Sequence, residues 1–171
     1  MQRKWKLSAC IIGALMSLQS VFSLDVSIQV IQRDPVHSKK TETSCLVEDT
    51  IIDTLFEYGY IASNLPLEVI GENADVKKLQ KDGIYKCSDG LADYFAMVIV
   101  DLDGQASANP ETALISSVKD VEWAVYDVVS GKALDSGKID RKALQYGDGQ
   151  EGVESLGLNV SSLINESLCN R

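Results

Sequence analysis

The fold is decided by the stretch WAVYDVVSGKALDSGKI, residues 123–139. An apolar run ends at Asp127, and a second, shorter run ends at Ile139. Trp123 and Val125 share one parity of an extended chain, which predicts that both side chains point from a strand into the core. Between the two runs stand Ser130, Gly131 and Lys132, which could bind a phosphate or turn the chain.

The phosphate-binding alternative fails on its spacing. A phosphate-binding loop requires a glycine five residues before Gly131 and a serine or threonine directly after Lys132. Those positions hold Tyr126 and Ala133. Two runs of alternating apolar residues around Ser130-Gly131 instead predict a β-hairpin, in which Gly131 supplies a positive φ angle in the turn.

Hydrophobic periodicity predicts the remaining elements. They are strands at 25–32, 60–67 and 94–102, helices at 44–58, 72–81 and 153–168, and the two hairpin strands at 118–129 and 133–139. The strand at 94–102 is apolar on both parities, which indicates a central strand covered on both faces. The sequence therefore predicts an α/β fold, a two-layer or three-layer sandwich on a mixed sheet of about five strands, in the order β-α-β-α-β-β-β-α. The predicted core comprises Ile51, Leu55, Phe56, Val98, Val100, Trp123 and Val125.

Residues 1–23 have the pattern of a cleaved signal peptide. Arg3, Lys4 and Lys6 precede an apolar stretch at 7–18, and cleavage is expected before Leu24. The rival interpretation is an uncleaved N-terminal anchor. Lipidation at Cys10 is disfavoured because most of the apolar stretch follows that cysteine. We therefore expect residues 24–171 to form a single α/β domain that is periplasmic or secreted and not embedded in a membrane.

Three cysteines follow the signal peptide, namely Cys45, Cys87 and Cys169. An oxidising compartment permits one disulfide among them and leaves one thiol over. The favoured pair is Cys45–Cys87, because both residues flank predicted elements of the same half of the chain. The alternatives are the other two pairings, or three free thiols that behave as small apolar side chains.

Composition excludes several classes of function. The chain has 25 acidic and 16 basic residues, so it repels nucleic acid and anionic surfaces. The single histidine, His37, lies in a polar linker, and the segment Asp101–Gly104 does not meet the spacing of a calcium loop. Glu48 falls within the apolar arc of its helix. It lies in the first turns, where an acid interacts favourably with the helix dipole, so a structural role is favoured over a catalytic one. We predict no catalytic, cofactor-binding or metal-binding residue, and no enzymatic activity.

Three stretches resemble the TolB N-terminal and CsgG-like domains. They are CLVEDTIIDTLFEYGYIASN at 45–64, LADYFAMVIVDLDG at 91–104 and VEWAVYDVVSGKALDSGKI at 121–139. Leu91 stands where that family has glycine, and Ser130 stands where it usually has threonine. The resemblance extends over residues 25–168 and implies a periplasmic module that binds and assembles other proteins and has no catalytic residues.

These observations predict a non-enzymatic periplasmic interaction or assembly protein that supports an envelope complex of the secretion or flagellar type. Its partner would be a protein of the cell envelope. The expected binding surfaces are the hairpin, the loop at 104–117 and any exposed sheet edge, which could add a strand from a partner. The alternatives are a small-ligand or cation-binding periplasmic protein and a hydrolase that uses His37. No feature of the sequence indicates an oligomeric state.

Overall fold

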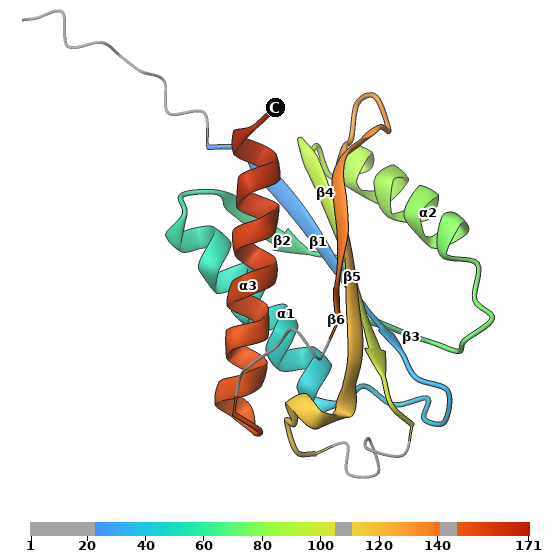
Figure 1. Cartoon of the computed structure of the whole chain (residues 1–171). Helices are drawn as coiled ribbons and strands as arrows, with labels where there is room; N and C mark the ends of the chain where they lie inside the picture. Colours follow the sequence, from blue (N-terminus) through green and yellow to red (C-terminus); the bar gives the residue numbers. More distant parts are fainter. Residues whose placement is uncertain (1–22, 105–110, 141–146) are drawn as a thin grey trace, which may run out of the picture.

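The structure is a computed structural model of the chain and describes residues 23–104, 111–140 and 147–171. One open sheet carries helices on both faces (Figure 1). The strands are β1 (Asp25–Arg33), β2 (Ile61–Asn64), β3 (Glu68–Ile70), β4 (Tyr94–Leu102), β5 (Val118–Asp127) and β6 (Ala133–Asp140). The helices are α1 (Glu42–Glu57), α2 (Val76–Asp89), α3 (Gln150–Cys169) and the short 3-10 turn η2 (Ile115–Ser117).

The sheet is mixed, as the sequence predicts, and its strand order is β2-β1-β4-β5-β6. β1 pairs in parallel with β2, β3 and β4, whereas the pairs β4–β5 and β5–β6 are antiparallel. The single strand predicted at 60–67 is instead two short strands, β2 and β3, that both pair with β1. Pro66 lies between them, and a proline has no backbone N–H to donate to a ladder.

β4 is the centre of the fold, and all nine of its residues are buried. The side chains of Val98 and Val100 face a core that α1 and α3 cover. Phe95 and Met97 face the opposite way, into a second core that α2 covers. The sheet is therefore the middle of three layers, with α1 and α3 on one side and α2 on the other (Figure 1).

The second helix is longer than the sequence pattern indicates. Periodicity predicts a helix over 72–81 that ends at Asp82-Gly83, but α2 continues through Gly83 to Asp89. A Cβ atom at Gly83 would lie 2.4 Å from Cζ of the buried Phe95 ring. Gly83 is thus not a helix terminator. It lets the backbone of α2 approach the sheet closely.

Phe56 is a correction to the predicted core, because 53% of its surface is exposed. The buried side of α1 follows Val47, Ile51 and Leu55, at four-residue spacing. Thr54 joins this side with its Oγ1 donating to the carbonyl of Thr50 at 2.7 Å, and Phe56 lies outside it. The other predicted core residues, which are Ile51, Leu55, Val98, Val100, Trp123 and Val125, are at most 7% exposed.

The predicted signal peptide lies outside the described residues apart from Ser23, so it remains a prediction, as does the single domain from 24 to 171. Within the described ranges, none of the helices has the length and apolar composition that a membrane crossing requires.

The close approach of α2 to the sheet generates a stability prediction. Gly83→Ala should lower the free energy of unfolding by about 1–3 kcal/mol, because the buried Phe95 ring must move to admit a methyl group. Urea denaturation measures the loss. The control is Gly90→Ala at the end of the same helix, where a Cβ atom meets nothing closer than 3.5 Å. Equal stability of the two variants would contradict the packing described.

The hairpin turn generates a second prediction. Gly131 has a φ angle of +67°, and a Cβ atom added there would meet no atom within 4 Å. Only backbone strain therefore opposes a side chain at this position. Gly131→Ala should cost about 1 kcal/mol of unfolding free energy, whereas Gly131→Asn should cost less, because asparagine tolerates the left-handed region better. Thermal unfolding of both variants checks the order. An alanine variant as stable as the wild type would exclude the strained turn.

Candidate binding groove beside the edge of the sheet

The groove exists because α2 packs over one part of its face of the sheet. Val76, Leu79 and Ile84 of α2 pack against a core that contains Ile31 and Phe95, from β1 and β4. The same face of the sheet continues past α2 across β5 and β6 (Figure 1). A groove of ≈ 430 Å³ lies there between α2 and the last strand.

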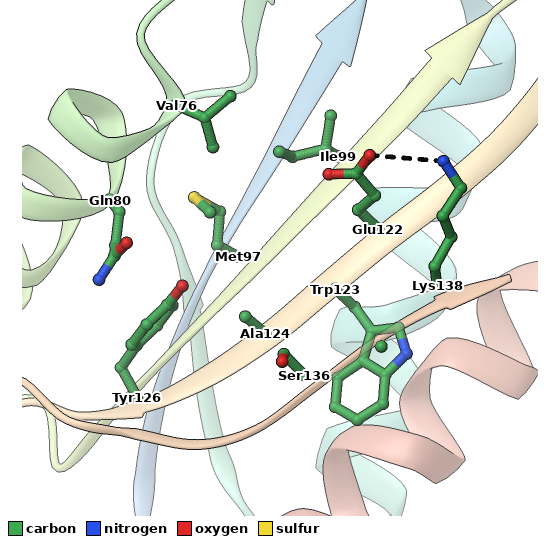
Figure 2. Close-up of a pocket in the computed structure, with 11 residues that line it drawn as sticks. Val76, Gln80, Met97, Ile99, Glu122, Trp123, Ala124, Tyr126, Ser136 and Lys138 are labelled. Atoms are coloured by element: carbon green, nitrogen blue, oxygen red, sulfur yellow. Dashed lines mark ion pairs between the residues drawn. The ribbon is translucent and has the colours of Figure 1, made fainter.

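The groove has an apolar floor, which the strand register explains. Met97 pairs with Ala124, and Ala124 pairs with Ser136, so these three side chains form one row across β4, β5 and β6. In Figure 2, Val76 and Gln80 of α2 lie on one side and β6 lies on the other. The residues that line the groove are Val76, Gln80, Met97, Ile99, Glu122, Trp123, Ala124, Tyr126, Ser136, Gly137 and Lys138.

Tyr126 forms one end of the groove and joins it to the core under α2. Its ring stacks on Phe95 with 6.0 Å between the ring centroids and 23° between the planes. Its phenol is neutral at pH 7, and burial raises the pKa of this group further above its ordinary value of 10.0. The floor therefore presents aromatic and aliphatic surface without a charge at this end.

The other end of the groove is bordered by ion pairs. Lys138 Nζ lies 2.9 Å from Asp120 Oδ2 and 3.5 Å from Glu122 Oε1, and the second contact is drawn in Figure 2. The hydrogen bond to Asp120 is the main cause of the raised pKa of Lys138. Arg33 Nη1 approaches Glu122 Oε1 at 3.5 Å and Asp101 Oδ2 at 3.3 Å. This arrangement offers an apolar surface with a charged border, and such surfaces bind other molecules.

The predicted hairpin residues lie at the tip of β5 and β6 and do not line the groove. The carboxylate of Asp127 accepts a hydrogen bond from the backbone N–H of Ser130 at 2.6 Å. Hydrogen bonding to the Ser130 side chain, and then to its backbone N–H, lowers the pKa of Asp127. Gly131 and Lys132 complete the turn before β6 begins at Ala133. The loop predicted as a second binding surface, at 104–117, includes residues 105–110, which lie outside the described residues.

The structure does not bring the favoured cysteine pair together. Cys45 packs with the core on the side of α1 and α3, whereas Cys87 is buried in the core under α2. The sheet lies between these two layers, so a Cys45–Cys87 disulfide would have to pass through it. Both thiols are free, as is the exposed Cys169 at the end of α3.

The side chains that the sequence suggests for catalysis or metal binding do not come together in one site. His37 Nδ1 contacts Asp34 Oδ2 at 3.3 Å in the loop after β1. Asp101 forms ion pairs with Arg33 and Lys119. Across the described ranges, no three histidine, cysteine, aspartate or glutamate side chains are grouped in a way that could hold a metal ion.

Glu48 is nearly buried in the second turn of α1, and its Oε1 accepts a hydrogen bond from Asn64 Nδ2 at 3.3 Å. Burial is the main cause that raises its pKa, and the Asn64 hydrogen bond opposes the shift. A carboxyl whose pKa is raised on folding stabilises the fold most in its protonated form. That contribution is complete below the ordinary pKa of 4.5 and is lost as the pH rises through the folded value.

Glu48→Gln should therefore raise the unfolding temperature at pH 7, because glutamine keeps an acceptor for Asn64 and carries no charge. The gain should shrink as the pH falls through 4.5. Thermal melts between pH 3 and pH 7 measure it, with Glu57→Gln at the exposed end of α1 as the control. A loss of stability at pH 7 would show that the fold requires the carboxylate.

Sequence reasoning missed the groove. The alternation at 118–129 assigns Trp123 and Val125 correctly to a buried side, and it also places Glu122, Ala124 and Tyr126 on the other side. The signal available in the sequence was the small Ala124 between the acidic Glu122 and the aromatic Tyr126, which leaves room for a groove on that side. The pattern contains no information on how far α2 extends over that side.

Comparisons with known proteins give the family and three distant structures. A family model described as "Uncharacterised protein" matches residues 25–169. No curated protein matches the chain. The chain is similar to the PelC dodecamer of Paraburkholderia phytofirmans, with 12% identity, coverage of 85% of this chain and 87% of that one, and a TM-score of 0.42.

The chain is also similar to the LpoB C-terminal domain of Escherichia coli, with 12% identity, coverage of 72% and 87%, and a TM-score of 0.41. The third structure is the lipoprotein GNA1162 of Neisseria meningitidis, with 17% identity, coverage of 81% and 94%, and a TM-score of 0.35. Similarities at these scores carry no argument about function. The matching family model is not one for TolB or CsgG, so the finer resemblance remains a hypothesis.

Proposed function

The chain belongs to the family of uncharacterised proteins whose model matches residues 25–169, and we propose that it is a non-enzymatic binding protein of the cell envelope. Its partner is a protein, and the groove between α2 and β6 is the surface that binds it. The signal-peptide pattern of residues 1–23 supports the location, and the resemblance to TolB N-terminal and CsgG-like domains supports the type of function.

The observation that carries the proposal is the apolar floor beside the end of the sheet. Met97, Ala124 and Tyr126 are nearly buried members of the core under α2, yet they also line the groove. Partner side chains placed there would extend an existing core, and each aliphatic side chain buried contributes about 1.5–3 kcal/mol. Ion pairs at the border, where Glu122 is 39% exposed, can set the orientation of the partner.

Small-ligand binding is the second candidate, and one observation favours it. A volume of ≈ 430 Å³ is within the range of about 300–1,000 Å³ that is usual for small-molecule sites. An apolar molecule could occupy the same floor. The two candidates differ in the area used, because a protein partner must also contact the rims of the groove.

A bulky residue in the groove tests the proposal. Ser136 is exposed on β6 and lines the groove, so Ser136→Trp should fill it without disturbing the core. We expect the variant to retain its fold. In a pull-down from envelope extract it should recover at least tenfold less partner than the wild type. The matched control, Ser88→Trp, lies on the exposed side of α2 away from the groove.

Equal recovery of the partner by Ser136→Trp and the wild type would exclude the groove as the binding surface. Circular dichroism of both variants separates loss of binding from loss of folding. If a small molecule and no protein co-purified with the wild type, and were absent from Ser136→Trp, the second candidate would replace the first.

A further inference from the structure

We propose that β6 accepts an extended, basic segment of the partner as an additional strand of the sheet. This inference rests on the proposed function and specifies its mode of binding. Within the described residues β6 pairs only with β5, so its other side presents backbone N–H and C=O groups along an edge. An extended peptide has the complementary row of donors and acceptors.

The two edges of the sheet differ in a way that singles out β6. The edge next to β1 is formed by β2 and β3, which have four and three residues and are separated by Pro66. Such a short and interrupted edge is poor at pairing with another strand. β6 has eight residues, contains no proline and has most of its side chains exposed.

A charged side chain on an edge strand can block the addition of another strand, but the half-exposed Lys138 of β6 leans toward β5. Lys138 Nζ is held by Asp120 and Glu122 of β5, at 2.9 Å and 3.5 Å. On the opposite face, the Trp123 ring covers Gly137 so closely that a Cβ atom there would lie 2.8 Å from Nε1. Neither residue therefore obstructs the edge.

The groove lies within reach of a strand added at this edge. Strands are spaced about 4.8 Å apart, so a side chain on the added strand has only β6 between it and the floor on β5. The residues of β6 at that point are Ser136 and Gly137, which are small. An apolar side chain of the added strand would pack beside Ser136 and would continue the row of Met97, Ala124 and Ser136 across the sheet.

The charge of the chain determines the chemistry of the segment. The protein has a formal net charge of −9, and Asp135 is an exposed acid of β6 on the face toward α3, where its Oδ2 accepts a hydrogen bond from Ser167 Oγ at 3.3 Å. Asp120 also has a buried Oδ1 atom with no hydrogen-bond partner, next to the edge strand. Alternating apolar and basic residues fit this surface, whereas an acidic strand would be repelled.

The experiment uses the purified full chain and an eight-residue peptide of alternating lysine and valine. Two further peptides are methylated on the backbone nitrogens of the lysines only or of the valines only. Because alternate amides of a strand point to opposite sides, one methylated peptide should bind like the parent and the other at least tenfold more weakly in calorimetric titrations. A glutamate–valine peptide should also bind at least tenfold more weakly than the parent.

Equal affinity of the two methylated peptides, or no measurable binding of the parent, would overturn strand addition. The groove itself would still stand if Ser136→Trp lost the partner in the pull-down, and it would fall only if that variant retained it. A stable dimer of the chain that Ser136→Trp converts to a monomer would also overturn the proposal, since a second copy would then occupy the edge. Sedimentation of the free protein distinguishes this outcome.

Discussion

The burial of every residue of β4 requires apolar cover on both faces of the sheet. Val98 and Val100 on one side and Phe95 and Met97 on the other cannot all be shielded by a single layer of helices. α1 and α3 together cover the first side, and α2 covers the second. Because one helix is narrower than a sheet of this width, the second side continues beyond α2 as the groove.

The way α2 is held determines where the groove lies. Gly83 lets the helix backbone come down onto Phe95, which fixes α2 above β4. The stacked rings of Phe95 and Tyr126 connect this contact to β5, so the core under α2 and the floor of the groove are continuous. A change that lifted α2 from the sheet would therefore alter the candidate binding surface as well as the stability.

Local pattern was sufficient for most of the fold. The two apolar runs around Ser130-Gly131 predict the hairpin, and the apolar run at 94–102 predicts the buried central strand, because both depend on neighbouring residues alone. The errors occur where a distant contact decides. Gly83 resembles a helix terminator until Phe95 is placed against it, and Phe56 resembles a core residue until the buried side of α1 is fixed by its packing. The Cys45–Cys87 pair failed for the same reason, since chain order does not reveal the face of the sheet that each helix covers.

The candidate site was less predictable than the fold, because its parts come from four elements. Val76, Met97, Ala124 and Ser136 are unremarkable in sequence, and only the strand register and the position of α2 bring them together. Hydrogen–deuterium exchange of the chain with its captured partner tests the central claim most directly. The account predicts that protection on binding is confined to β5, β6 and the first turns of α2. Protection confined to α1 and α3, with β6 unchanged, would contradict it.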